Sequence, residues 1–302
     1  GGSIGLTAFS VALAPSNGTT RVGCAIVSGF EPNESVTITG LPSTYGVNGI
    51  FADANGTIYL WLPDGDYSFT ANNRPCSAKI KNGVGACGVT VNGDDVAFGS
   101  DDPVAAGWSY DATTRILELT GAGPFTLSGN NEFGHVCVVA SDAVVNAVTL
   151  SNLTLRATDN DQCAFALGKN ANVSLVLAGA NTLDSGANRA GLEVPAGTSL
   201  AITNAPDDST GSLTATGGSN GAGIGGGYDG AGGTVEVYGG VVTATGGSSA
   251  AGIGGGANSY WGPRSAHGGA VTISGGTVTA TGSGNGAGIG GGDYGAGGTV
   301  SI

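Results

Sequence analysis

The phrase LTATGGSNGAGIGGG at residues 213–227 returns as VTATGGSSAAGIGGG at 242–256 and as VTATGSGNGAGIGGG at 278–292. Repetition in a fixed order indicates a solenoid, in which each unit buries its apolar side only against its neighbours. The connecting segments TVEVY (234–238) and AVTIS (270–274) alternate apolar with polar residues, which is the period of a strand. We therefore predict a parallel β-helix whose coil reads strand, glycine corner, strand, loop, short AGIGG strand, loop.

Earlier coils are degenerate, and the apolar centre of the short third strand traces them. In successive coils this marker is Val138, Phe165, Leu192, Ile224, Ile253 and Ile289, which gives coils of about 27–36 residues. A partial coil, ILELTGAGPFTLSG (116–129), precedes them. We expect the solenoid to begin near Trp108, to wind in the right-handed sense of parallel crossovers, and to continue beyond Ile302 in the natural protein.

Residues 1–92 differ in texture and are expected to form a separate domain. Short alternating strands such as GTIYLWLP (56–63) and GDYSFTANN (65–73) are divided by Pro, Gly and Asn turns, which suits a small β-sandwich. The predicted fold class is all-β, with a β-sandwich over 1–92 and a parallel β-helix over 93–302. The stretch at 91–107 would join them.

Composition limits the partners. Sixty glycines in 302 residues accompany 40% hydrophobic residues, so a folded chain is expected. Nine basic against 22 acidic residues give a net charge of −13, which disfavours nucleic acid and anionic membranes. No apolar run approaches the ~20 residues of a spanning helix, so no membrane insertion is predicted. The chain opens on Gly-Gly-Ser without Met, as a mature or excised fragment would.

Five cysteines leave several pairings open. Cys76 could pair with Cys87 across a hairpin, or Cys24 with either of them, and Cys137 lies near Cys163 on successive coils. The alternative is that they are buried thiols acting as small hydrophobic residues, with Cys163 pointing inward. Zinc is not predicted, because there is no Cys-x-x-Cys pair and no His–Cys cluster.

The GAGIGG motif invites a cofactor interpretation. It matches the dinucleotide pattern GxGxxG, but no helix is predicted after it, so a structural use is favoured. Ala222 and Ile224 would point inward, while Gly223 and Gly225 leave a bare outer face for another chain, a sugar polymer or a neighbouring coil. We predict no cofactor, with calcium at Asp229 or Asp293 as an alternative.

No sequence motif indicates a set of catalytic residues. His135 and His267 have no nucleophile signature beside them. A polysaccharide lyase or glycoside hydrolase would need paired carboxylates, and the acidic candidates are scattered over loops of different coils. These candidates are Asp159, Asp161, Asp184, Asp207 and Asp208. A binding protein without catalytic residues is therefore favoured over an enzyme.

Two surface arrays could bind a ligand. The first is a predicted aromatic ridge in the loops after GGG, where rings would stack on sugars and polar groups would bind hydroxyls. Its members are Tyr228, Asp229, Tyr260, Trp261, Arg264, Asp293 and Tyr294. The alternative is that the rings cover core edges. The second array is a ladder of outward threonines, which resembles the flat faces of ice-binding β-helices; threonine is also common on solvated strands. The ladder contains Thr214, Thr216, Thr243, Thr245, Thr277, Thr279 and Thr281.

The segments WSYDATTRILELTG (108–121), NTLDSG to GTSLAIT (181–203) and the GAGIGGG repeats resemble β-helical domains of bacterial cell-surface proteins. Those domains are commonly labelled carbohydrate-binding and are related in fold to pectate lyases. The resemblance implies an extracellular, adhesin-like protein that binds polysaccharide or host glycan. The phrase LPDGDYSFTA (62–71) resembles hairpins of immunoglobulin-like modules, which implies a spacer. A purely structural stalk remains a further alternative.

Overall fold

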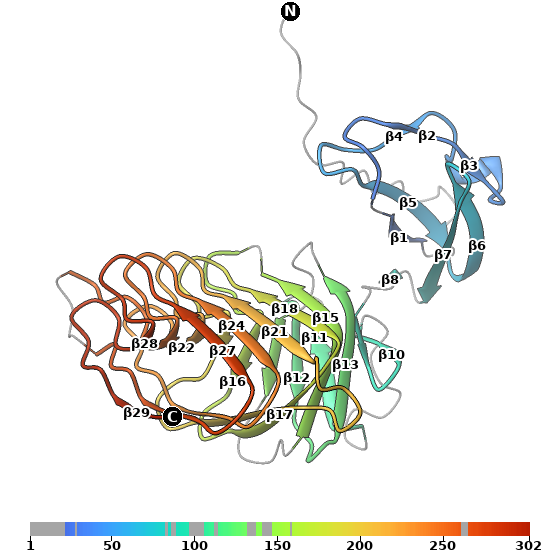
Figure 1. The fold of residues 1–302 in the computed structure, drawn as a ribbon. Helices are drawn as coiled ribbons and strands as arrows, with labels where there is room; N and C mark the ends of the chain where they lie inside the picture. The colour runs from blue at the N-terminus through green and yellow to red at the C-terminus, as the bar shows by residue number, and fades with distance from the viewer. Residues whose placement is uncertain are drawn as a thin grey trace, which may run out of the picture. The chain divides into compact units, whose positions relative to one another are not determined.

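The computed structural model describes residues 22–27, 29–81, 84–85, 89–96, 106–111, 114–131, 137–140, 147–157, 159–260 and 265–302. The chain divides into two compact units, residues 1–86 and 87–302 (Figure 1). Among the described residues the named elements are strands, apart from one 3₁₀ turn, η1 (Ser43–Tyr45). The all-β class is therefore confirmed. None of the helices in the described part is long and apolar enough to cross a membrane.

The first unit holds three small antiparallel sheets. Its strands are β1 (Val22–Val27), β2 (Ser35–Val36), β3 (Ile38–Thr39), β4 (Ile50–Phe51), β5 (Ile58–Pro63), β6 (Gly65–Ala71), β7 (Arg74–Lys81) and β8 (Val84–Gly85). β1 pairs with β5, β2 pairs with β4, and β3, β6, β7 and β8 form the third sheet. Ile58, Leu60 and Leu62 alternate into a core that also contains Phe69 and Ile80. The sandwich and the immunoglobulin-like assignment stay predictions.

The second unit is a solenoid with three columns of stacked parallel strands (Figure 1). Column A contains the first halves of β13 (Phe125–Asn131) and β15 (Ala147–Arg156), then β17 (Asn172–Ala178), β20 (Ser199–Asn204), β23 (Thr234–Val237), β26 (Ala270–Ile273) and β29 (Thr299–Ser301). Column B contains the second halves of β13 and β15, then β18 (Ala180–Asp184), β21 (Ser212–Thr216), β24 (Val241–Thr245) and β27 (Thr277–Thr281). Column C contains β12 (Ile116–Leu119), β14 (Cys137–Ala140), β16 (Phe165–Leu167), β19 (Leu192–Glu193), β22 (Ile224–Gly225), β25 (Ile253–Gly254) and β28 (Ile289–Gly290).

The register of column C confirms the marker residues chosen from the sequence. Val138 pairs with Phe165, and Phe165 with Leu192. The ladder continues from Leu192 through Ile224 and Ile253 to Ile289. All but the last of these are buried, and they belong to one continuous apolar core. Each predicted repeat is therefore one coil, with its inward side chain at the expected position.

Antiparallel strands close the start of the solenoid. β9 (Val89–Val91) pairs with the edge of β13 and with β10 (Asp94–Asp95), and β11 (Trp108–Asp111) pairs with β12. Val89, Val91 and Trp108 are buried in the solenoid core. This covering belongs to the second unit, residues 87–302. The physical reason is that the edge of β13 needs a partner for its backbone groups.

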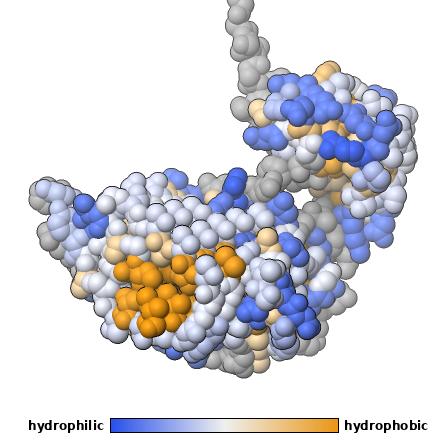
Figure 2. Space-filling model, viewed as in Figure 1, coloured by the Kyte–Doolittle hydropathy of each residue, from blue (hydrophilic) through white to orange (hydrophobic). Residues whose placement is uncertain are grey.

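Among the described residues, no strand stacks beyond β27 in column B or beyond β28 in column C. Val278, Ala280 and Ile289 are only partly buried there, and Val300 and Ile302 are exposed. Figure 2 shows an apolar patch at this end of the solenoid.

Candidate functional site

The loops that carry the predicted ridge are held in place by a regular backbone pattern. In each coil, the residue after the glycine triplet donates its N–H to a loop of the preceding coil. Tyr228 donates to the Asn188 carbonyl, Ala257 to that of Asn220, and Asp293 to that of Ser249, each at 2.8 Å. Tyr228, Ala257 and Asp293 are therefore equivalent positions, and the loops between column C and column A rise at the constant spacing of the coils.

Three tyrosines of the ridge are exposed on these loops. Tyr228 is 42%, Tyr260 76% and Tyr294 54% accessible. They do not occupy one row, because the equivalent of Tyr228 in the last coil is Asp293. Tyr294 instead matches Asp229, and both have left-handed backbones, with φ of 57° and 56°. Tyr260 lies in a longer loop of the middle coil. Trp261 and Arg264, the other predicted members, lie outside the described residues.

Asp229 and Asn258 fasten the base of the longer loop. The Asp229 carboxylate Oδ1 accepts the Ser259 N–H at 2.5 Å, and the Asp229 carbonyl accepts the Ser265 hydroxyl at 2.6 Å. Asn258 Oδ1 accepts the N–H groups of Ser265 and Ala266 at 2.9 and 3.0 Å, and its amide donates to the Asp293 carbonyl. Asp229 thus has a structural task, which is to hold the two ends of the loop that bears Tyr260.

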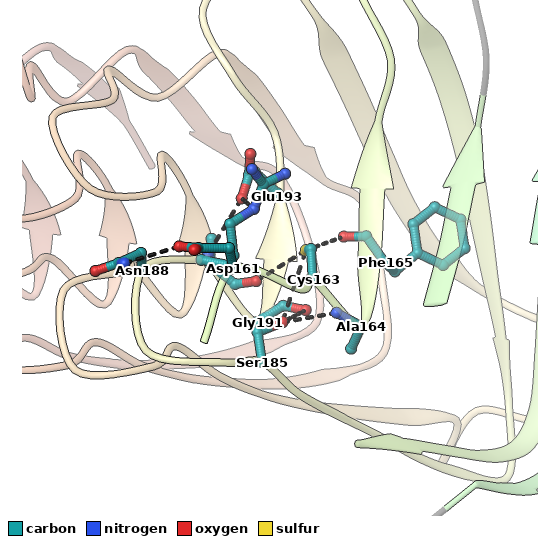
Figure 3. Close-up of polar contacts among 10 residues, drawn as sticks. Asp161, Cys163, Ala164, Phe165, Ser185, Asn188, Gly191 and Glu193 are labelled. Atoms are coloured by element: carbon teal, nitrogen blue, oxygen red, sulfur yellow. Dashed lines mark hydrogen bonds and ion pairs between the residues drawn. The ribbon is translucent and has the colours of Figure 1, made fainter. Parts of the chain in front are cut away.

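A polar stripe runs beside Tyr228 on the preceding loops. The Asn220 amide donates to Asn188 Oδ1 at 2.9 Å, and the Asn188 amide donates to the Asp161 carboxylate at 2.8 Å. Figure 3 shows the Asn188–Asp161 contact. Sequence reasoning missed both asparagines, although each stands two residues before an Ala-Gly pair of the repeat. Together they form a chain of polar side chains on the loops whose carbonyls accept the N–H groups of Tyr228 and Ala257.

Glu193 is a further group that the sequence did not single out. It lies in register with Gly225, but its carboxylate turns back to accept the Ala190 N–H at 3.4 Å. In later coils the same N–H, from Ala222 or Ala251, is bound by a backbone carbonyl at 3.0 Å. Burial raises the pKa of Glu193, against the opposing effect of Arg189, whose Nε lies 2.8 Å from its Oε2. We therefore assign Glu193 to closing this turn.

Cys163 is the buried thiol expected from its register (Figure 3). Its sulfur lies 3.1 Å from the carbonyls of Phe165 and Ala190, and burial raises its pKa to about 12. Cys24, Cys76 and Cys163 are free thiols, so the disulfides suggested for these three are not formed. Cys87 and the side chain of Cys137 lie outside the description.

Most of the carboxylates considered for a hydrolase or lyase form ion pairs or hydrogen bonds with neighbouring residues. Asp159 pairs with Arg115 at 3.6 Å and Asp184 with Arg156 at 3.2 Å. Asp208 accepts the Gly179 N–H at 2.6 Å, which lowers the pKa of its carboxyl group. Asp161 belongs to the stripe described above, and Asp207 is exposed.

The histidines and potential metal ligands are equally dispersed. His267 Nδ1 accepts the Ala296 N–H at 3.0 Å, a contact between neighbouring coils. His135 lies outside the described residues. In the described part of the chain, no three His, Cys, Asp or Glu side chains gather in a way that could hold a metal ion.

The glycines of GAGIGGG serve the stacking of coils. A Cβ on Gly225 would lie 2.0 Å from the Gly254 carbonyl oxygen, and one on Gly254 would lie 1.9 Å from that of Gly290. Gly223 and Gly225 are buried, so the expectation of a bare outer face was wrong. Of the three neighbours considered for them, the adjacent coil is the one present. A strand, β23, follows the motif where a dinucleotide site would need a helix.

The threonine ladder is longer than the repeats suggested. Thr214, Thr243 and Thr279 stack in register on column B, and Thr182 and Thr154 extend the row through two earlier coils. A second row contains Thr216, Thr245 and Thr281. The inward positions between the rows are Ala215, Ala244 and Ala280. As expected, Ser212 and Val241 interrupt the row that holds Thr277.

A family model described as a beta helix repeat matches residues 211–228, 235–257 and 271–293. Each matched segment contains one whole copy of the repeated phrase, and the strands of these coils stack in parallel. The second unit is a parallel β-helix. The comparisons with curated proteins and with solved structures gave no match.

Proposed function

We propose that the β-helix binds neutral polysaccharide or host glycan through the loops of the ridge, without cleaving it. The observation that carries this proposal is the placement of Tyr228, Tyr260 and Tyr294, all exposed, on one series of loops fixed by backbone hydrogen bonds. Sugar rings present apolar faces to aromatic side chains and hydroxyls to polar ones. Asn188 and Asp161 supply such polar groups beside Tyr228.

Charge favours a neutral glycan over an anionic one. The chain has a net charge of −13, and the Arg189 guanidinium near the stripe is paired with Glu193. A uronate or sulfated polymer would meet this negative field without a free cation from Arg189. We place the protein outside the bacterial cell, as an adhesin-like component of the surface. The resemblance of its repeats to cell-surface β-helices supports this location.

A glycan array probed with the full chain tests the proposal. We expect binding to one class of neutral glycan, and we expect Tyr228→Ala and Tyr260→Ala to weaken it at unchanged melting temperature. A reducing-sugar assay on the bound glycan, with and without calcium, should show no new ends. Turnover that Asp159→Ala or Asp184→Ala abolishes would instead support the hydrolase or lyase alternative.

The five-coil threonine row supports a second candidate function, which is binding to ice. Threonine is stiff at χ1, so stacked strands repeat its methyl and hydroxyl groups about every 4.8 Å along the solenoid. Such an array suits an ordered, flat ligand. Ice-growth inhibition that Thr243→Tyr removes would support this candidate, and growth unaffected by the wild-type chain would eliminate it.

A further inference from the structure

The first unit presents two aromatic rings on one strand face. In β5, Ile58, Leu60 and Leu62 are buried, while Tyr59 and Trp61 are each 48% accessible. Residues two apart on a strand project to the same side, so the two rings lie about 6.7 Å apart along the strand. A spacer, the role expected of this unit from its sequence, does not explain the exposed pair.

Strand β1 borders the pair on one side. Cys24 of β1 lies directly across from Trp61 in the antiparallel register, and Ile26 lies across from Tyr59. Cys24 is partly buried, and this burial raises the pKa of its thiol to about 11, so the thiol is neutral at physiological pH. Cys24 is a free thiol.

A fixed carboxylate stands at the other side of the pair. Asp53 Oδ2 accepts the Tyr59 hydroxyl at 3.2 Å, and Asp53 Oδ1 accepts the N–H groups of Asn55 and Thr57 at 2.8 and 3.0 Å. Three donors hold this carboxylate in one orientation, and its remaining lone pairs are suited to a hydroxyl or an ammonium group. The nearby Arg74 guanidinium is engaged with the Phe30 ring and the Gly29 carbonyl.

The size and charge of this surface indicate which class of ligand it could bind. An aromatic side chain buries 150–250 Å², so two half-exposed rings offer roughly 200 Å², far below the ~800 Å² that each partner of a stable protein interface buries. A protein partner is therefore poorly matched to it. An anionic sugar would be repelled by Asp53. A neutral or amino sugar has an apolar face for each ring and a donor for the carboxylate.

We propose that the first unit is itself a sugar-binding module, in which Tyr59 and Trp61 stack on rings of a neutral glycan and Asp53 accepts one of its hydroxyls. The proposal stands independently of the ridge on the β-helix. With both sites present, the chain carries two glycan sites, one in each unit.

Three soluble probes test this site on the full chain: laminarin and galactomannan as neutral polymers, and polygalacturonate as an anionic one. We expect calorimetric titration to show binding of a neutral probe and at least a tenfold loss of affinity in Trp61→Ala. Trp61→Phe, which keeps a ring, should retain most of the affinity. Ser68→Ala, on an exposed position of β6, is the matched control and should bind like the wild type.

The outcomes separate this site from the ridge. Bound glycan should protect Trp61 from acrylamide quenching even in a Tyr228→Ala, Tyr260→Ala, Trp261→Ala chain, in which three rings of the ridge are removed and the buried Trp108 is the only other tryptophan. Wild-type affinity in Trp61→Ala and in Tyr59→Ala would overturn the proposal, as would binding of polygalacturonate alone or of none of the probes. If Trp61→Ala melts early, the Trp61→Phe titration and the quenching measurement decide in its place.

Discussion

The coils before and after residue 212 have the same strand columns, but different groups hold their turns together. In the earlier coil the Ala190 N–H is bound by the Glu193 side chain, whereas the Ala222 N–H of the next coil is bound by the Gly226 carbonyl. The earlier coils are linked across column B by the Arg156–Asp184 ion pair. At that position the later coils have only stacked threonines.

One inner row of column B differs in the same way. In this row Leu155 and Leu183 of the earlier coils are followed by Ala215, Ala244 and Ala280. Small residues inside and glycines at the turns bring backbone against backbone, so that successive coils repeat closely. The comparison shows that side chains can hold individual coils together, while glycine produces a regular series of loops. The ridge lies on that regular part.

The largest effect should come from a side chain placed between two late coils. In Gly254→Val the new Cβ would lie 1.9 Å from the Gly290 carbonyl oxygen, at a φ of 134° that β-branched residues avoid. We expect a loss of more than ~4 kcal/mol, measured by urea denaturation. Glu193→Ala, at the same register in the earlier coil, is the control and should lose no more than ~3 kcal/mol. Equal losses would show that the two kinds of coil do not differ.

A smaller loss is expected from the inner row of column C. Ile224 is fully buried between Leu192 and Ile253, so Ile224→Ala should cost about 2–5 kcal/mol through lost contacts and a cavity. Ile289 is only partly buried, and Ile289→Ala should fall below that range. A melting temperature of Ile224→Ala equal to that of the wild type would contradict the register.

The smallest effect concerns pH. Burial raises the pKa of Glu193 above its unfolded value, so its contribution to stability is fully present below the unfolded pKa, ~4.3, and is lost as pH rises through the folded pKa. Glu193→Gln has no such titration. The stability of the wild type relative to Glu193→Gln should therefore fall as pH rises from 4 toward 7. A stability difference between the two proteins that does not change with pH over this range would contradict the raised pKa of Glu193.

The sequence was sufficient to predict the stacking register, because glycine pairs and alternating residues recur at fixed places in each coil. It did not predict the covering strands β9 and β11, which occur once and carry no repeat. Glu193 was overlooked because its role depends on a turn in which its side chain binds the Ala190 N–H, where the later coils use a backbone carbonyl. Thr154 and Thr182 were overlooked because their coils have different spacings, so the row appears only when strands are paired.

The ridge was predicted only in outline. The loops after the glycine triplet were located correctly. In the middle coil, however, Ala257 occupies the position of Tyr228, and Tyr260 lies three residues later in a longer loop. In the last coil Asp293 occupies that position, and Tyr294 follows it. The use of Asp229 as a loop fastener follows from its contacts with Ser259 and Ser265, which lie 30 and 36 residues away in sequence. Contacts between residues so far apart in sequence, in loops that differ from coil to coil, produce no recognisable local sequence motif.

Calorimetric titration of the full chain with the best neutral glycan from the array tests the central claim most directly. The wild type should be compared with the double variant Tyr228→Ala, Tyr260→Ala, and with Tyr238→Ala, which removes an exposed tyrosine outside the ridge, directly after β23. We predict at least a tenfold loss of affinity in the double variant, wild-type affinity in Tyr238→Ala, and equal melting temperatures. Unchanged affinity together with a lower melting temperature in the double variant would contradict the claim, because the rings would then be covering the core.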